Sequence, residues 1–274
     1  MRAKLAMESL AVLAALAAAV HGGTPQPCAV VYGTVRDAYG YPYSTGAEVR
    51  IQRAAVICDR YHIRGPLGSG CNYRLELNLD SGGAYYTTNA VHAGDALTVA
   101  VSVAGTDAPL MPTHTLNAGK PGSLTRLDLC TGTDADGDGL PDEWEQLLVE
   151  QSGGLLGGLA DVRPGDDFDG DGMTNREEFQ AGTFPFLDTD LLAVQELKPV
   201  SAAGRFSVRF LAIANMTYRL VGRERLDGGT WYPVLFAGEP QAPATYRELV
   251  GDGRWRTVYV DMTSPSFFIR LAVQ

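Results

Sequence analysis

Two acidic segments in the middle of the chain place the strongest constraint on how it folds. Each is twelve residues long, beginning at Asp134 or Asp167, and each has aspartate at its first, third and fifth positions and glycine at its sixth. Carboxylates this close together repel one another unless a cation lies between them. The two segments are therefore predicted to be loops built around metal ions.

The spacing of the acidic residues fits calcium. Calcium takes roughly six to eight oxygen ligands, which a twelve-residue loop supplies from positions 1, 3, 5, 7, 9 and 12. The first loop offers Asp134, Asp136, Asp138, the Leu140 carbonyl, Asp142 and Glu145. The second offers Asp167, Asp169, Asp171, the Met173 carbonyl, Asn175 and Glu178. Two complete matches predict two calcium ions and not a pair of solvated acidic turns. Magnesium is less suited, because it keeps several of its own waters.

Both loops precede a helix but have no helix before them. This form, with the sequences Asp138-Gly-Leu-Pro-Asp-Glu-Trp-Glu and Asp171-Gly-Met-Thr-Asn-Arg-Glu-Glu-Phe, resembles thrombospondin type 3 and dockerin-like calcium repeats. It is most similar to the repeats of large bacterial secreted proteins. The resemblance implies a stabilising, spacing or surface-associated role. A dockerin would instead bind a cohesin, but no repeated recognition pair accompanies the short second helix.

The acidity of the chain is local. Residues 131–190 hold 16 acidic residues against Arg163 and Arg176, a net charge of -14, whereas the whole chain carries -10. The remainder is therefore slightly positive, without a cluster of lysine and arginine. Nucleic acid is not expected to be a partner.

Helices are predicted only within the acidic segment. Pro141 suits the first turn of a helix, and Trp144, Leu147 and Leu148 would share one face. A flexible stretch is expected over 153–165. A second short helix is expected from about Thr174 to Ala181.

The segments on either side alternate between apolar and polar residues, as half-buried strands do. The apolar positions before the acidic segment are Ala47, Val49, Ile51, Tyr73, Leu75, Leu77, Leu79, Leu97, Val99, Val101 and Val103. Those after it are Phe206, Val208, Phe210, Tyr218, Leu220, Val258, Val260, Ile269, Leu271 and Val273. This pattern predicts antiparallel β-sandwiches.

Two further resemblances support these sandwiches. The stretch Val31–Pro42 with Gly46–Val49 resembles the carboxypeptidase regulatory-like β-sandwich, which implies a fold and no reaction. Thr217–Val221 with Trp231–Leu235 resembles small sandwiches at the ends of bacterial secreted modular proteins. The predicted fold is mainly β, with two small Ig-like antiparallel β-sandwiches (24–130 and 191–274) joined by an acidic loop–helix calcium-binding segment (131–190).

Residues 1–23 are expected to be an export signal. Arg2 and Lys4 precede an unbroken apolar run from Leu10 to Val20 that is too short to span a membrane. The alternative is a buried N-terminal helix. The signal predicts a protein that is secreted or held at the cell surface, with the periplasm as another destination, and no transmembrane span after its removal.

The four cysteines all precede the acidic segment. An even number in an exported protein predicts disulfides. Four cysteines allow three pairings, of which Cys58–Cys71 with Cys28–Cys130 is preferred. The alternative is a metal or redox site, for which the C-x-x-C spacing is absent.

Catalytic residues do not form a recognisable set. The histidines are dispersed, and no H-E-x-x-H, G-x-S-x-G or phosphate-binding loop occurs. The expected function is therefore a non-enzymatic, calcium-binding structural module. The alternative is a calcium-dependent adhesion or dockerin-like module for an extracellular glycan or surface protein, in which exposed tyrosines stack on sugars. The candidate tyrosines are Tyr39, Tyr41, Tyr43, Tyr85 and Tyr86. A third reading, a secreted hydrolase, lacks an acid, base or nucleophile.

Overall fold

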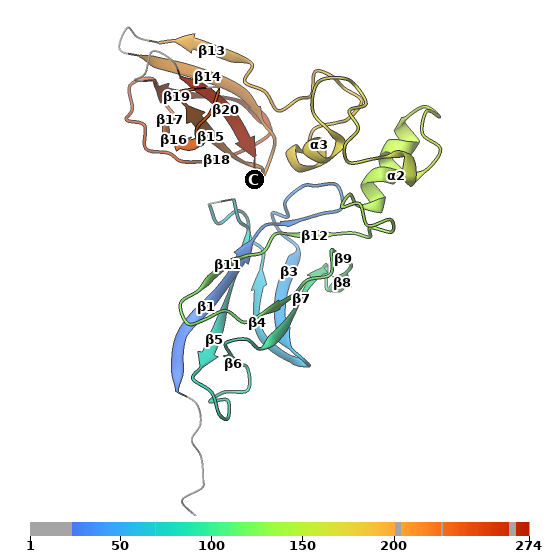
Figure 1. Cartoon of the computed structure of the whole chain (residues 1–274), viewed down its shortest axis with the longest axis vertical. Helices are drawn as coiled ribbons and strands as arrows, with labels where there is room; N and C mark the ends of the chain where they lie inside the picture. The colour runs from blue at the N-terminus through green and yellow to red at the C-terminus, as the bar shows by residue number, and fades with distance from the viewer. Residues whose placement is uncertain (1–23, 69, 201–203, 226, 263–266, 274) are drawn as a thin grey trace, which may run out of the picture.

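The computed structural model describes residues 24–274 apart from 69, 201–203, 226, 263–266 and 274. The predicted export signal lies outside the described residues and stays a prediction. Within the described ranges, no helix is long and apolar enough to cross a membrane. The chain forms two β lobes, with two helices beside the junction between them (Figure 1).

Residues before the acidic loops form the first lobe. Its strands are β1 (Pro25–Gly33), β2 (Val35–Arg36), β3 (Ala47–Arg53), β4 (Val56–His62), β5 (Tyr73–Asp80), β6 (Val91–His92), β7 (Ala96–Val103), β8 (Thr106–Ala108), β9 (Leu110–Met111), β10 (Thr115–Asn117), β11 (Leu124–Arg126) and β12 (Leu129–Thr131). One sheet has the order β11-β1-β5-β6, and a second has the order β10-β7-β3-β4 with β8 beside β7. A small sheet, β2-β12-β9, lies at the end towards the acidic loops.

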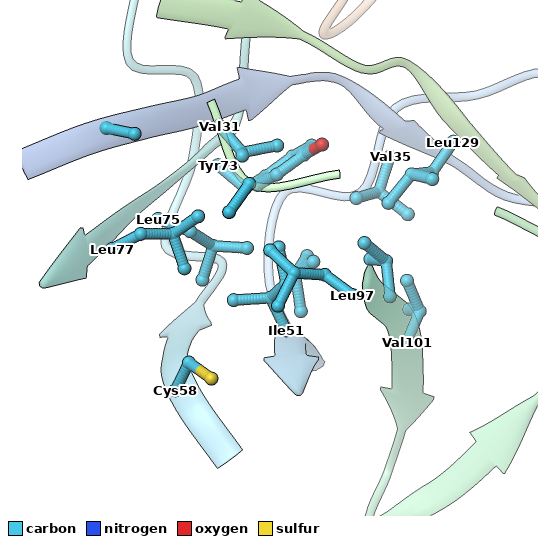
Figure 2. Packing of buried hydrophobic residues seen from close by; sticks show 14 of the residues in the cluster. Val31, Val35, Ile51, Cys58, Tyr73, Leu75, Leu77, Leu97, Val101 and Leu129 are labelled. Carbon is cyan, nitrogen blue, oxygen red and sulfur yellow. The ribbon is translucent and has the colours of Figure 1, made fainter. Parts of the chain in front are cut away.

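The inner faces of the two larger sheets form one hydrophobic core. Alternate residues of β5 (Tyr73, Leu75, Leu77) meet Ile51 of β3 and Val101 of β7, all without exposed surface (Figure 2). The predicted inward positions of this lobe are buried, except that Val103 is half-buried at the edge of the core. The two-residue alternation therefore identified the core face correctly.

Not all of the strand pairs are antiparallel. β1 pairs in parallel with β11, with Val30 opposite Leu124, and β2 pairs in parallel with β12, with Cys130 opposite Arg36. The last segment of the lobe thus runs alongside the first in the same direction. It delivers the chain directly from β12 into the first acidic loop.

The second lobe is also a pair of facing sheets. Its strands are β13 (Glu196–Pro199), β14 (Arg205–Ala212), β15 (Thr217–Arg223), β16 (Tyr232–Val234), β17 (Phe236–Ala237), β18 (Leu249–Val250), β19 (Arg254–Asp261) and β20 (Phe268–Val273). The sheets have the orders β13-β14-β19-β17 and β16-β15-β18, with β20 also paired to β15. Val208, Phe210, Tyr218 and Val260 are buried between them. The mainly β fold with several antiparallel sheets is confirmed.

Two helices and a 3-10 turn are the regular elements described in the acidic segment. They are α2 (Asp142–Gln151), α3 (Asn175–Ala181) and η1 (Leu159–Asp161). A third buried cluster contains Trp144 and Leu148 of α2, Phe179 of α3, and Val162, which follows η1. Within the stretch 153–165, for which flexibility stays a prediction, Val162 is buried at 1 % exposure.

The predicted disulfides are wrong, since all four cysteines are free thiols. The Gly122 amide donates to the Cys28 carbonyl, so Cys28 lies beside Gly122. Gly122 precedes Cys130 by eight residues, which span about 26 Å when extended. The Asp59 carboxylate accepts from the Glu76 amide, so Cys58, the neighbour of Asp59, lies near the middle of β5. Cys71 precedes Glu76 by five residues, which span about 16 Å when extended. A disulfide needs Cα atoms within about 7 Å.

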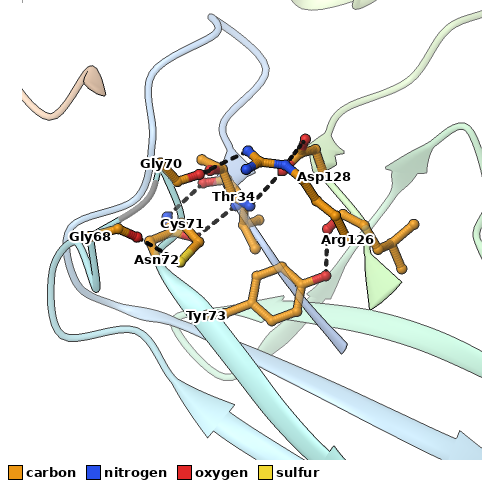
Figure 3. Close-up of polar contacts among 10 residues, drawn as sticks. Thr34, Gly68, Gly70, Cys71, Asn72, Tyr73, Arg126 and Asp128 are labelled. Atoms are coloured by element: carbon orange, nitrogen blue, oxygen red, sulfur yellow. Dashed lines mark hydrogen bonds and ion pairs between the residues drawn. The ribbon is translucent and has the colours of Figure 1, made fainter. Parts of the chain in front are cut away.

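Asn72 provides a test of the first lobe. This side chain is 3 % exposed. Its oxygen accepts from the Val35 amide at 2.8 Å, and its nitrogen donates to the carbonyls of Val35 and Tyr43 at 3.0 and 2.8 Å. Figure 3 shows Asn72 just before β5, close to the hydrogen bonds that Thr34 makes with the Gly70 carbonyl and the Asp128 carboxylate. Asn72→Ala leaves these buried groups unpaired. It should lower the free energy of unfolding by about 3 kcal/mol in urea denaturation.

Asn117→Ala is the matched control, because Asn117 is exposed on β10. It should change the free energy of unfolding by less than about 0.5 kcal/mol. Equal losses in the two variants would show that the Asn72 contacts contribute nothing specific.

Candidate metal centre

The two acidic loops have the same backbone structure. In each, the amide of position 4 (Gly137, Gly170) donates to the first aspartate at 2.8 Å. The amide of position 6 (Gly139, Gly172) donates to the other oxygen of the same carboxylate at 3.1 and 3.0 Å. The first aspartate thus folds each loop around itself.

The third and fifth positions repeat the pattern. Position 3 accepts from the amide of position 5, and position 5 accepts from the amide of position 7. These bonds turn three carboxylates towards one centre in each loop. One oxygen from each of Asp134, Asp136 and Asp138 lies within 4.8 Å of the others, and the same holds for Asp167, Asp169 and Asp171.

Glycine at position 4 is a feature that the sequence analysis missed. Gly137 and Gly170 both have a φ of 76°, and Gly139 and Gly172, at the predicted position 6, have φ of 90° and 96°. Such positive φ values are strained for residues with a side chain. The repeated Asp-Gly-Asp-Gly in both loops was the signal that could have identified position 4.

The glutamate at position 12 closes each loop from the following helix. Glu145 on α2 and Glu178 on α3 have no exposed surface. All four of their carboxylate oxygens are buried without a hydrogen-bond partner. Buried polar groups are nearly always partnered, so each of these carboxylates requires a cation or a proton.

The pKa values reflect this environment. Burial, followed by the negative charge of the loop aspartates, raises the pKa of Glu145 to about 8. Burial and the charges of Asp169 and Asp171 likewise raise the pKa of Glu178 to about 8, although the nearby Thr183 hydroxyl opposes part of this rise. Both glutamates therefore favour the protonated form whenever no cation is present.

Position 9 differs between the loops. The Asp142 carboxylate accepts from the Ala135 amide at 2.8 Å and so turns back over its own loop. The Asn175 side chain instead donates to the Arg163 carbonyl at 2.7 Å, and its oxygen is buried without a partner. In both loops the backbone amide of position 9 donates to the carbonyl of the residue before position 1 at 2.8 Å.

The residues present fit a hard divalent cation. Besides the two glutamates, the atoms without a partner in the second loop are Asp169 Oδ2, Asp171 Oδ2 and Asn175 Oδ1. All are oxygens, which is the donor type that calcium prefers. Leu140 and Met173, at position 7, are the residues whose carbonyls were predicted to bind. Their amides donate to the aspartate carboxylates at position 5.

Arg176 connects the two loops. It lies on α3, directly after position 9 of the second loop, and its guanidinium donates to the Asp138 carbonyl of the first loop. Its nitrogens are also near Gly139, where an added Cβ would lie 3.0 Å from one of them. Edge-to-face packing of Trp144 on Phe179, with ring centres 5.5 Å apart, joins the two helices behind the loops.

The end of α3 reaches both lobes. Arg36 of β2 donates to the Gln180 carbonyl at 3.2 Å and contacts the Met216 sulfur of the second lobe at the same distance. Gly182 ends α3 with a φ of 75°, and an added Cβ there would lie 2.7 Å from the Met216 methyl group. The second loop therefore leads into a three-way contact.

The candidate sugar-binding tyrosines do not form one surface. Tyr43 pairs with the Thr131 hydroxyl at 2.9 Å, whereas Tyr85 stacks on His92 and donates to Asp95 at 3.1 Å. Tyr39 and Tyr41 are about half exposed, at 45 % and 44 %. None of the ring contacts among the described residues joins two of these tyrosines.

The pH dependence of the metal-free protein follows from the two glutamates. Their pKa is about 8 when folded, against an ordinary 4.5, so the folded state holds protons that the unfolded chain releases. This contribution to stability is complete below pH 4.5 and is lost as the pH rises through 8. In chelator, the melting temperature should fall between pH 5 and pH 8.5.

The double variant Glu145→Gln/Glu178→Gln should lose most of this slope. Saturating calcium should reverse it in the unaltered protein, because the ion binds ionised carboxylates. An identical slope in the double variant would assign the pH dependence to other groups.

Comparison with known proteins supports the assignment of the loops. The family model described as bacterial TSP3 repeat matches residues 134–146 and 167–185. No curated protein and no solved structure matches the chain. The matched residues cover both loops, α3 and the start of α2, and this repeat is of a calcium-binding type. Together with the two aspartate triads, the match indicates calcium binding.

Proposed function

We propose that the chain is a non-enzymatic structural module of the cell exterior or cell surface, in which two calcium ions hold the acidic segment folded. The observation that carries the proposal is the pair of fully buried glutamates, Glu145 and Glu178, beside the two aspartate triads. A buried carboxylate is costly unless a positive charge compensates it. Calcium provides that charge in both loops.

The ligands assigned to the two ions follow the loop positions. The first ion takes Asp134, Asp136, Asp138, the Leu140 carbonyl, Asp142 and Glu145. The second takes Asp167, Asp169, Asp171, the Met173 carbonyl, Asn175 and Glu178. Glu145 and Glu178 are the strongest ligands, since both their oxygens are free to bind.

The proposed role of the ions is to fix the two lobes relative to each other. The helices that the loops begin have ten and seven residues, which is too short to persist alone. Loss of calcium would therefore release α3. The contact between Arg36, Gln180 and Met216 would be lost with it.

Location outside the cell is proposed from the apolar N-terminal run and the TSP3 match. The absence of enzymatic activity is proposed because the sequence holds no recognisable catalytic set, and among the described residues the groups of three possible metal ligands are those of the two loops. The proposed partner is an extracellular glycan or a surface protein. Neither nucleic acid nor a membrane is proposed.

Calcium titration tests the ligand assignment. Calorimetry should give two ions per chain, with dissociation constants of about 10⁻⁴–10⁻³ M if the sites resemble other extracellular modules. Glu145→Gln should lower the calcium affinity of the first site by at least about 10- to 100-fold. Loss of a residue that only supports a metal ligand already has an effect of this size. Asp142→Asn should weaken the first site less, because position 9 often binds through a water.

A stoichiometry near zero would contradict the proposal. Equal effects of Glu145→Gln and Asp142→Asn would contradict the ligand order. A Glu143→Gln variant is the control, because Glu143 lies on the same helix turn but outside the ligand positions.

Chelation tests the structural role. Removing calcium should lower the melting temperature of the full chain. It should also increase the maximum dimension of the molecule in small-angle scattering, because the acidic segment opens while both lobes keep their cores. An unchanged melting profile and envelope would mean that the ions do not hold the lobes. Turnover in a substrate screen that vanishes on mutation outside the loops would contradict the non-enzymatic role.

A further inference from the structure

One outward sheet face of the second lobe carries arginine and tryptophan. Along β15, Tyr218 and Leu220 are buried in the core, so Val221 and Arg223 project from the opposite face. Val221 is opposite Arg270 of β20, which places Arg270 on that outward face as well. Extending the register of β16 by one residue puts Trp231 opposite Arg223.

The three side chains are in contact. The guanidinium carbon of Arg223 lies 4.5 Å from the centre of the Trp231 ring, and that of Arg270 lies 4.7 Å from it. One indole therefore holds two positive charges close together. Cation–π contacts of this kind also reduce the freedom of both arginine side chains.

Among the described residues, neither arginine forms an ion pair with an acidic side chain. Nearby, Arg219 pairs with Glu248 at 3.0 Å and Arg225 pairs with Asp227 at 2.7 Å. Within the described ranges, Arg223 and Arg270 form no ion pair or hydrogen bond, and Arg223 Nε is buried without a partner. The bond from Arg225 is the main reason that the pKa of Asp227 is low, and Arg223 adds little.

We propose that Arg223 and Arg270, held side by side by Trp231, bind the sulfate or carboxylate groups of an acidic polysaccharide. Two adjacent guanidiniums repel each other, and an oxyanion shared between them removes this repulsion. Their planar N–H groups match the oxygens of sulfate and carboxylate.

A saccharide fits this face better than an acidic peptide does. The site lies on an outward sheet surface, where the exposed Pro233 is opposite Val221 and next to the Trp231 register position. Flat apolar groups beside charged donors suit the C–H faces of sugar rings as well as their acidic substituents. The site lies in the second lobe, apart from the acidic loops (Figure 1), and does not depend on the proposed calcium role.

Three dextrans with one backbone test the proposal on the full chain in saturating calcium. Affinity electrophoresis would compare neutral, sulfated and carboxymethylated dextran. Both anionic polymers should retard the protein, and the tighter one identifies the preferred oxyanion. Neutral dextran should not retard it.

Arginine variants locate the binding. Arg223→Gln and Arg270→Gln should each weaken binding by about tenfold or more, as for loss of a hydrogen bond to a charged group. Arg225→Gln is the matched control, because Arg225 lies on the same segment with its own partner, Asp227. It should bind as the unaltered protein does. Unchanged melting temperatures would confirm that the variants are folded.

Three results would overturn the proposal. The first is no retardation by either anionic dextran. The second is an equal loss in Arg225→Gln, which would mean binding to general positive charge. The third is equally tight binding of polyglutamate with the same pattern among the variants, which would assign the face to an acidic protein.

Discussion

The cost of burying a carboxylate governs the middle of this molecule. Glu145 and Glu178 have no exposed surface, and within the described residues their oxygens have no hydrogen-bond partner, although the Thr183 hydroxyl lies near Glu178. Their neighbours are further carboxylates. No apolar packing could offset several unpaired charges gathered in this way. The small cluster around Trp144 and Phe179 forms directly behind these glutamates, so it can persist only while the charges are neutralised. Neutralisation of these charges, by a cation or by protons, is thus a condition of the local fold.

The two β lobes do not share this dependence. Each has facing sheets and its own buried core, and none of the loop carboxylates belongs to either core. The acidic segment is coupled to both lobes at its ends, through the β12–β2 pairing on one side and the Arg36, Gln180 and Met216 contact on the other. The arginine–tryptophan face lies on the outer side of the second lobe. The proposed cation sites and the proposed oxyanion site therefore lie in different parts of the chain.

The sequence predicted the structure correctly where a local pattern, such as the alternation of apolar residues, determines a strand or a helix. The alternation of Tyr73, Leu75 and Leu77 identified a core strand, and the second helix was expected from about Thr174, which caps α3. It failed where distant segments meet. Parallel pairing of β1 with β11 depends on the path of the whole lobe, and that path separates the cysteines expected to pair. Arg176, Arg36 and the site around Trp231 likewise arise from contacts that no local pattern encodes.

The acidic segment is the covalent connection between the first lobe and the second, so it bears any force that pulls the lobes apart. Tension applied between the lobes is carried by that one covalent path and by the contacts between the lobes, which include those around Arg36 and Met216. Helices of ten and seven residues resist extension only while their loops are closed. Calcium concentration would then set the compliance of the molecule, and the segment would lengthen under load before either sandwich begins to unfold.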